Sequence, residues 1–333
     1  MAARRRGRDW PDVRLHVVTG KGGTGKTTVA AALALALAMG GGRTLLVEVE
    51  GRQGIAQLFD TPPLPYEERL VALARDGGEV YALAIDPREA LMEYLTMYYH
   101  AGPAGRALER LGAVDFATTI APGLRDVLLT GKAYEAVRRR SRDGGEGQPV
   151  YDAVVMDAPP TGRIVPFLDV NTQVAGLARS GPIHRQAESI MALIRSPRTA
   201  VHVVSTLEEM PAQETADGVG ALGAAGLPVG AVVVNMVRRS PLRGRDLSAA
   251  ARGELDPAEV AAALEAVSLP PRWADALLEE ATRQARRVRM ERRVRADLAA
   301  LHRPLYELPL VQGGVDLGAL YDMADQLAGQ GAA

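Results

Sequence analysis

The sequence has 333 residues, of which 47% are hydrophobic, a formal net charge of −1 and no cysteine. This length suits one large α/β domain with insertions, and the small net charge gives no global field that would attract nucleic acid. The absence of cysteine excludes disulfides, a thiolate zinc site and an iron–sulfur cluster.

The chain begins with a basic segment, MAARRRGRDWP, that lacks the apolar core of a signal peptide. We predict a disordered basic tail over residues 1–12, followed by a single domain over 13–330. No apolar run reaches the roughly 18 residues that a membrane span requires. These features predict a cytoplasmic protein with no stable membrane insertion and no nucleic-acid partner.

Short β-branched runs recur along the domain, and each is followed by a helical pattern. We predict strands over 15–19, 44–49, 80–85, 151–157, 200–205, 229–235 and 305–310. Nearly continuous apolar strands separated by helices indicate a doubly wound, mostly parallel α/β sheet covered on both faces. Such sheets bind ligands at the carboxyl ends of their strands.

The loop after the first strand is GKGGTGKT, which matches G-x-x-x-x-G-K-[ST] between a predicted strand and a predicted helix. Backbone N–H groups of residues 22–27 would surround the β-phosphate of a nucleoside triphosphate. Lys26 would bridge the β- and γ-phosphates, and the Thr27 hydroxyl would bind Mg²⁺. The predicted nucleotide-binding residues of this loop are Gly20, Lys21, Gly22, Gly23, Thr24, Gly25, Lys26, Thr27 and Thr28.

Lys21 is a second lysine in this loop, in a chain that has only three lysines among its 39 basic residues; the third is Lys132. The segment KGGTGKT resembles the deviant Walker A loop of the MinD/ParA/ArsA group of dimeric P-loop ATPases. The resemblance implies that Lys21 reaches across a dimer interface to the partner's phosphates, as an arginine finger does.

The interval between the third and fourth predicted strands is too long for one crossover helix. Helical patterns over 87–99, 103–111, 123–140 and 164–194 predict a helical subdomain, from about 86–148 and 164–198, inserted above the carboxyl edge of the sheet. Apolar residues over 91–99 fit either a groove for a hydrophobic client or ordinary core, and the sequence leaves both open.

Further segments resemble the arsenical-pump (ArsA) and Get-type tail-anchored-protein-targeting ATPases. VYDAVVMDAPPTGRIVPFL resembles their second switch, D-x-A-P-T-G-H, which implies that Asp157 holds a Mg²⁺-bound water and that residues 158–163 sense the γ-phosphate. TTIAPGLRDVLL resembles a segment of their helical subdomain. VVVNM and ELPLVQGG imply adenine contacts from Asn235, Pro309 and Leu310, although Asn235 also fits a simple strand-end cap.

The first switch departs from the pattern of this family. The family has D-P-A-H-S, whose Asp positions the attacking water, whereas this sequence has EGRQG with Glu50 in that place. A carboxylate displaced by about 1 Å can cost roughly 10²-fold in rate. Two interpretations stay open: Glu50 is catalytic with Lys21, Lys26 and Asp157, in a subunit that hydrolyses ATP slowly alone, or it is a solvated acid.

The resemblance implies ATP and Mg²⁺ as cofactors and a dimer whose closure is controlled by nucleotide. It is closest to the actinobacterial branch described as anion-transporting ATPase. Because arsenite is bound through thiolates, a chain without cysteine is not expected to transport it, and the zinc clamp of the targeting factors has no ligands here.

Three functions follow from these features. The first is a Mg-ATP-dependent dimeric ATPase that couples its nucleotide cycle to binding or delivery of an unknown protein client, such as a membrane-destined one. The second is a nucleotide-gated regulatory subunit of a hetero-dimer with a paralogous ATPase. The third is a MinD/ParA-like positioning ATPase.

Overall fold

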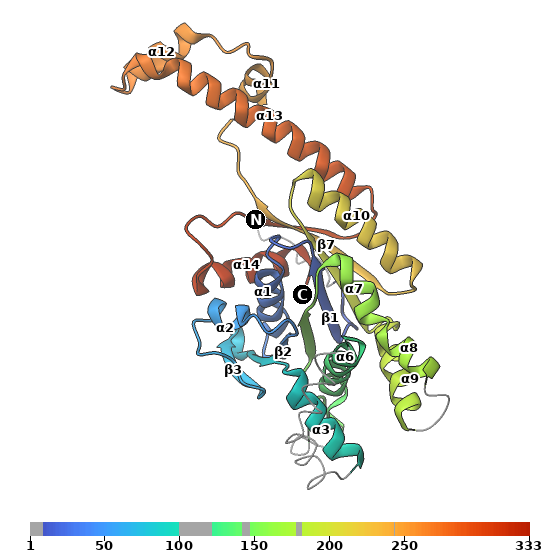
Figure 1. The fold of residues 1–333 in the computed structure, drawn as a ribbon. Coiled ribbons are helices and arrows are strands. Elements are labelled where there is room, and N and C mark those ends of the chain that lie inside the picture. Colours follow the sequence, from blue (N-terminus) through green and yellow to red (C-terminus); the bar gives the residue numbers. More distant parts are fainter. Residues whose placement is uncertain (1–8, 100–121, 142–146, 178–181, 243) are drawn as a thin grey trace.

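A computed structural model describes residues 9–99, 122–141, 147–177, 182–242 and 244–333, which form an α/β fold around one eight-stranded sheet (Figure 1). The strand order is β3-β4-β2-β5-β1-β6-β7-β8, and every neighbouring pair is parallel except β3 and β4. The strands are β1 (Leu15–Gly20), β2 (Arg43–Glu48), β3 (Arg69–Leu73), β4 (Glu79–Ala84), β5 (Ala153–Asp157), β6 (Thr199–Ser205), β7 (Val229–Val237) and β8 (Leu305–Pro309).

The prediction of a doubly wound, mostly parallel sheet is confirmed, and all seven predicted strands are present. The missed strand is β3, which pairs antiparallel at the sheet edge and is mostly exposed. Its short segment, RLVAL, lacks the long apolar run of a strand buried on both faces. Within the described ranges, no helix has the length and hydrophobicity that crossing a membrane demands.

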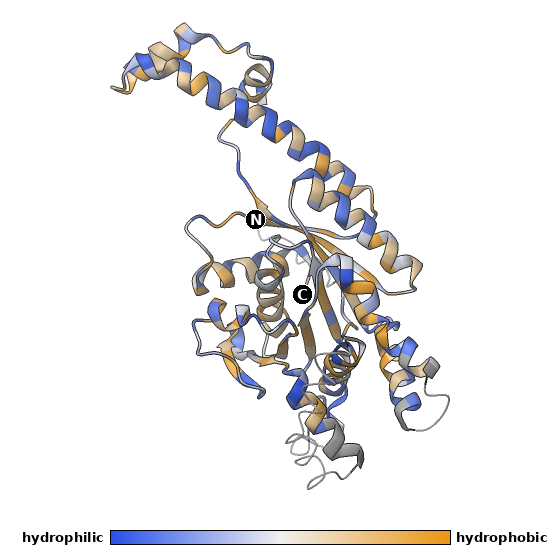
Figure 2. Ribbon diagram, viewed as in Figure 1, coloured by the Kyte–Doolittle hydropathy of each residue, from blue (hydrophilic) through white to orange (hydrophobic). Residues whose placement is uncertain are grey.

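Helices cover both faces of the sheet. Buried side chains of α1 (Lys26–Ala38), α2 (Gly54–Leu58) and α14 (Leu317–Gln330) pack on one face. The other face is covered by α3 (Pro87–Tyr99), α6 (Pro122–Arg138), α7 (Thr161–Leu168), α9 (Pro182–Ile194) and α10 (Glu209–Ala224), with α8 (Val170–Leu177) packed beside α9. Hydrophobic residues accordingly concentrate in the strands and in the helix faces that meet them (Figure 2).

Helices α3 and α6 agree with the predicted helices 87–99 and 123–140 to within two residues. The predicted helix over 103–111 lies outside the described residues. The described helices of both insert segments share one hydrophobic cluster with the strands, so this part of the insert covers a sheet face. The proposed boundaries of a separate helical subdomain stay a prediction.

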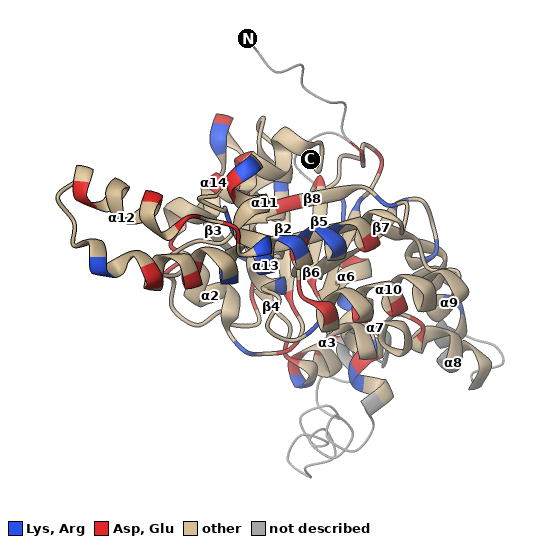
Figure 3. Cartoon of the chain, turned by 90° about the horizontal axis from the view of Figure 1, so that it is seen from above, with Lys and Arg blue, Asp and Glu red and all other residues tan. Residues whose placement is uncertain are grey.

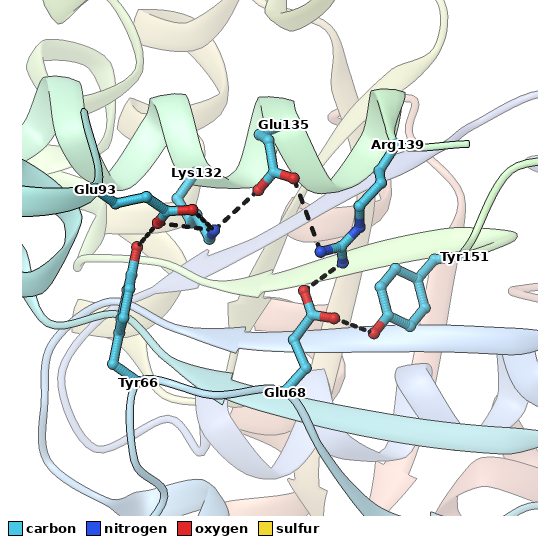
Figure 4. A network of polar contacts seen from close by, with 7 residues as sticks. All are labelled: Tyr66, Glu68, Glu93, Lys132, Glu135, Arg139 and Tyr151. Carbon is cyan, nitrogen blue, oxygen red and sulfur yellow. Dashed lines mark hydrogen bonds and ion pairs between the residues drawn. The ribbon is translucent and has the colours of Figure 1, made fainter. Parts of the chain in front are cut away.

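A chain of polar contacts fastens α3 and α6 to the loop before β3 and to Tyr151, two residues before β5 (Figure 4). Lys132 on α6 lies between two carboxylates, with its Nζ 2.9 Å from Glu93 Oε1 and 3.0 Å from Glu135 Oε2. The remaining members of the network are Tyr66, which donates to Glu93, and Arg139 and Tyr151, which both contact Glu68. Lys132, the third lysine of the sequence, is therefore fixed by ion pairs within this network, away from the phosphate loop.

Residues at the end of the predicted N-terminal tail contact the domain. The backbone N–H of Asp9 donates to Gly331 O at 2.9 Å, and Trp10 Nε1 donates to the Tyr306 hydroxyl at 3.0 Å. The half-buried Trp10 also packs its ring against His202, so residues 9 and 10 contact the domain through backbone, hydroxyl and ring.

The crossover between β7 and β8 is an extended helical arm. It comprises α11 (Gly244–Arg252), α12 (Pro257–Ala266), a short 3₁₀ turn at Pro271–Trp273 and the outer part of α13 (Ala274–Ala299). Asp256 caps α12 by accepting from Ala258 N at 2.8 Å. In Figure 1 the arm projects away from the sheet, with α12 at its tip. This projecting arm was not among the predictions from the sequence.

A buried histidine pair lies on β1 and β6. His202 Nδ1 accepts from Ala231 N at 3.1 Å, so its proton is on Nε2, which faces His16 Nδ1 at 3.0 Å. Both rings are fully buried, and burial lowers the pKa of His202 to about 4 and that of His16 well below its ordinary value. A further proton on either Nδ1 would break one of these two bonds.

This pair predicts a loss of stability in acid. An unfolded imidazole binds a proton near pH 6.5, whereas folded His202 does so only near 4. Between these values the unfolded chain binds more protons, so the free energy of unfolding falls as the pH falls. Urea unfolding at pH 7.5 and 5 should give a loss for the native chain that is about 2 kcal/mol larger than for His202→Gln. His184→Gln, at a half-buried histidine, should behave like the native chain; equal losses in all three would contradict the prediction.

Candidate nucleotide-binding site

The loop between β1 and α1 has the conformation of a phosphate cradle. Gly23 and Gly25 have φ of 85° and 83°, in the left-handed region that favours glycine, and α1 begins directly afterwards at Lys26. The first turn of a helix leaves N–H groups without intrahelical acceptors, and here no acidic residue occupies that turn. These groups and the positive end of the helix dipole therefore face the loop, where an anion can bind.

Gly25 is also required by a close approach from β7. Asn235 Nδ2 donates to Thr24 O at 2.9 Å, and a Cβ added to Gly25 would lie 2.4 Å from that nitrogen. Asn235 is buried at the carboxyl end of β7, where the neighbouring Met236 has a φ of 58°. The structure thus brings the predicted adenine residue against the predicted phosphate loop.

Pro309 and Leu310 lie at the end of the adjacent strand. Pro309 pairs with Val237 in the β7–β8 ladder, and Leu310 N donates to Val237 O at 3.0 Å. These two residues and Asn235 therefore occupy neighbouring strand ends, although Leu310 is 38% exposed.

Lys26 is a buried cation without an opposite charge bound to it. Its side chain is only 8% exposed, and none of the ion pairs among the described residues includes it. A desolvated ammonium is costly unless a counter-ion neutralises it. A phosphate held by the loop would supply that counter-ion.

Thr27 and Asp157 come together from α1 and β5. The Thr27 hydroxyl donates to Asp157 Oδ2 at 2.6 Å, while Asp157 Oδ1 is buried without a hydrogen-bond partner. Burial raises the pKa of Asp157 to about 6, against the opposing effects of Thr27 and Lys26, and Glu48 and Glu50 raise it further. A hydroxyl beside a carboxylate with one free oxygen is a suitable pair of ligands for hydrated Mg²⁺.

Glu48 is a site residue that sequence reasoning missed. It ends β2, is 2% exposed, and accepts from Gln53 N at 2.5 Å and Ile55 N at 3.2 Å. These bonds hold the start of α2, where Gln53 has a φ of 57°. The available signal was the alternation in VEVEG, because residues two apart in an extended chain, such as Glu48 and Glu50, lie on the same side of it.

Glu50 lies in the loop that Glu48 closes. Its carboxylate is 22% exposed and forms an ion pair with Arg52, with 3.6 Å between Oε2 and Nη2. Its charge raises the pKa of Asp157, which places the two carboxylates in one electrostatic environment. Both interpretations of Glu50, catalytic residue or solvated acid, remain compatible with this position.

Lys21 does not face its own phosphate loop as Lys26 does. Its Nζ contacts Glu214 Oε1 on α10, and both side chains are about one third exposed. Glu214 was not predicted, and no sequence pattern links it to the loop, because the two residues are 193 positions apart.

The first turn of α6 contacts the loops after both β2 and β5. Arg125 Nη2 donates to Val49 O at 3.3 Å, and Asp126 Oδ1 lies 3.5 Å from Arg163 Nη2 at the start of α7. Thr19 joins this region by donating to Pro159 O at 2.7 Å. Two adjacent residues of one helix therefore connect the first and second predicted switches.

The residues fit a Mg²⁺–nucleoside triphosphate. The glycine cradle, the unpaired Lys26 and the free Asp157 oxygen each provide for a different part of that ligand, and all lie at the carboxyl edge of β1 and its neighbours. Glu48 and Glu214 are the two carboxylates at this edge that sequence reasoning missed.

Comparison with known proteins gives matches along nearly the whole chain. A model of the family described as anion-transporting ATPase matches residues 13–197. ATPase BagA of Mycobacterium tuberculosis is 54% identical over 328 residues, which cover 97% of this chain and 96% of the relative. The arsenical pump-driving ATPase of Escherichia coli is 26% identical over 252 residues, 70% of this chain and 41% of the relative. ATPase get3 of Schizosaccharomyces japonicus is 26% identical over 183 residues, 52% of this chain and 51% of the relative.

The raised pKa of Asp157 predicts that this residue costs stability. At pH 7.5 the carboxylate is charged in both states, but burial disfavours the charge only in the folded chain, whose pKa is about 6 against 3.8 for the ordinary group. Asp157→Asn keeps an acceptor for Thr27 and removes the charge. It should raise the free energy of unfolding at pH 7.5 by up to about 3 kcal/mol.

The gain should shrink as the pH falls from 6 toward 4, because folded Asp157 then becomes protonated in the native chain. Urea unfolding at several pH values measures it, with the exposed Asp322→Asn as control. A destabilised Asp157→Asn variant at pH 7.5 would show that the carboxylate is a net stabilising group.

Proposed function

The chain belongs to the anion-transporting ATPase family, and from this premise we propose that it is a cytoplasmic, Mg²⁺-dependent ATPase that acts as a dimer and couples its nucleotide cycle to the binding or delivery of a protein partner. Membership of the family supports ATP hydrolysis itself. The dimer, the metal ion and the partner belong to the proposal.

The dimer is supported above all by the position of Lys21. One lysine of the loop, Lys26, is buried and unpaired, as a ligand of the chain's own nucleotide would be. The other, Lys21, contacts Glu214 at the surface, although the chain otherwise uses arginine almost everywhere. A partly exposed ammonium beside the nucleotide is suited to reach the phosphates of a facing subunit, as an arginine finger does.

The roles of the other residues follow from their contacts. Lys26 and the loop N–H groups bind and orient the phosphates, with Gly20, Gly22, Gly23, Thr24 and Thr28 forming the rest of the cradle. Thr27 and Asp157 would hold the hydrated Mg²⁺, which would supply positive charge to the phosphate oxygens. Asn235, Pro309 and Leu310 contact the adenine.

Glu50 orients the attacking water only if its ion pair with Arg52 opens, which supports slow hydrolysis by the isolated chain.

Coupling to a protein partner is supported by the first turn of α6. Arg125 contacts Val49, next to Glu50 after β2, and Asp126 contacts Arg163 at the start of α7, so movement of either segment on hydrolysis would move α6. The helix continues into the layer of α3, α8 and α9, whose outer surface would meet the partner. Arsenite transport is not proposed, because the sequence has no thiolate to bind arsenite.

A hetero-dimer with a paralogous ATPase is the second candidate, and the altered first switch favours it. If Glu50 stays paired with Arg52, this chain would bind nucleotide and control closure while the paralogue hydrolyses ATP. Nucleotide-dependent mass in solution separates the two candidates.

The dimer predicts a change in solution mass. By light scattering, the 35.4 kDa chain should double its mass when Mg²⁺ and a slowly hydrolysed ATP analogue are added, and Lys21→Ala should remain a monomer that still binds the analogue. Lys132→Ala removes the one lysine outside the loop and should still dimerise if its fold is intact. A native chain that binds the analogue as a monomer would favour the hetero-dimer.

Glu214→Gln refines this measurement. Because an exposed ion pair contributes up to about 1 kcal/mol, release of Lys21 should lower the analogue concentration needed for dimerisation by up to about fivefold. An unchanged midpoint would mean that Glu214 does not restrain Lys21.

The proposed coupling through α6 predicts a change in apolar surface. Fluorescence of an apolar dye should differ between the ADP and ATP-analogue states of the native chain, and Arg125→Ala should at least halve this difference while nucleotide still binds. Arg195→Ala, at an arginine of the same helical layer that pairs with Asp169, is the matched control. Equal dye binding in all nucleotide states would count against a partner surface controlled by the nucleotide.

A further inference from the structure

The helical arm begins at the same edge of the sheet as the nucleotide site. Strand β7 is parallel to β6, and β6 is parallel to β1, so Val237 at the end of β7 lies on the edge where β1 enters the phosphate loop. The crossover to β8 must start at this edge and return to the opposite one.

The chain needs only the C-terminal part of α13, which lies against the sheet, to return to β8. Val294 and Leu298 pack with Val232 and Val234 of β7, whereas Ala285 and Val288 pack with α11. The helix therefore leaves the sheet near residue 288. At 1.5 Å per residue, the stretch from Ala274 to that point extends roughly 20 Å, and α12 is attached at its outer end.

The tip of this arm is apolar and exposed. Val267 is 64% exposed and Trp273 is 46% exposed, and Leu269 and Leu277 are exposed beside them. Four large apolar side chains thus lie within eleven residues, at the part of the described chain farthest from the sheet. A monomer gains nothing from this cluster, which marks a contact surface.

The charges along the arm are divided between its two parts. Residues 254–280 contain seven Asp and Glu and one Arg, whereas 281–293 contain six Arg and one Glu. In the cartoon of Figure 3, acidic residues (red) lie toward the α12 end and basic residues (blue) along the middle of α13. Arg286, Arg289 and Arg293 are exposed on one face around Met290, and no ion pair is found for them among the described residues.

We propose that the arm is a subunit clasp, in which the acidic, apolar tip of one copy docks on the basic face around Met290 of α13 in a second copy. This inference rests on the proposed dimer, in which Lys21 requires the nucleotide edges of two copies to face each other. An arm that extends beyond that edge must then lie alongside the partner. A tip and a face of opposite charge on one helix make two equivalent contacts about a two-fold axis.

The absence of cysteine from the sequence allows a direct test. Chains carrying Leu277→Cys and Met290→Cys, with different tags, are mixed with Mg²⁺ and the ATP analogue, oxidised, and analysed by non-reducing electrophoresis. A disulfide between the two tagged chains is expected, at least about tenfold above that of Leu277→Cys mixed with Glu188→Cys, whose cysteine is on α9. The cross-link should disappear without nucleotide.

Charge reversal tests the same contact without cysteine. Asp275→Arg with Glu279→Arg should weaken nucleotide-dependent dimerisation about tenfold, and Arg286→Glu with Arg289→Glu in the second copy should restore it. Glu188→Arg, at an exposed carboxylate on α9, should have no effect.

The outcomes separate this inference from the proposed function. A nucleotide-dependent homodimer without the cross-link, and unaffected by charge reversal, overturns the clasp and leaves the dimeric ATPase intact. A chain that binds the analogue but stays monomeric overturns both the clasp and the homodimer, and leaves the hetero-dimer as the remaining candidate. The cross-link with charge rescue establishes the clasp.

Discussion

The parallel sheet imposes the constraint on which the site depends, because all parallel strands deliver their carboxyl ends to one edge. Residues distant in sequence meet there: Thr24 and Asn235 are 211 positions apart, and Thr27 and Asp157 are 130 apart, yet both pairs are hydrogen-bonded. The crowding is tolerated only because Gly25 has no side chain in the space that Asn235 occupies. Hydrogen bonds from β5 and β7 therefore fix the phosphate loop and the start of α1, although the loop is rich in glycine.

This edge concentrates unfavourable electrostatics that a bound nucleotide would relieve. Lys26 is buried without an ion pair, and Asp157 is buried with one oxygen free and a pKa raised to about 6. Lys26 and Asp157 attract each other, but they form no direct ion pair, so both remain available to a ligand. Groups fixed in this way need no reorganisation when phosphate and metal ion arrive, and electrostatic preorganisation of this kind is a large contribution to catalysis. The rest of the fold must supply the stability that the site gives up.

Much of this could be predicted from the sequence, and the failures have physical causes. The apolar runs predicted seven strands because burial on both faces leaves a strong pattern, whereas β3 lies at an edge and has a weak one. The loop residues, Thr27, Asp157 and Asn235 were predicted because their spacing within motifs fixes their positions relative to a strand end. Glu48 and Glu214 were missed because a single carboxylate carries no pattern, and its partner is chosen by tertiary structure. The arm was missed because amphipathic periodicity predicts a helix but says nothing about where the core beneath it ends.

The three lysines bring these arguments together. In an arginine-rich chain, each lysine stands where a planar, bidentate guanidinium would be unsuitable. Lys132 fits between Glu93 and Glu135 as a compact charge, and Lys26 is enclosed in the loop. Lys21 faces a carboxylate that it must be able to leave. An arginine would bind Glu214 through two parallel hydrogen bonds and would be held more firmly, whereas an ammonium on a flexible chain exchanges one anion for another at little cost. The choice of lysine at position 21 is therefore explained by movement between two anions, and in the proposed dimer the second anion belongs to the facing subunit.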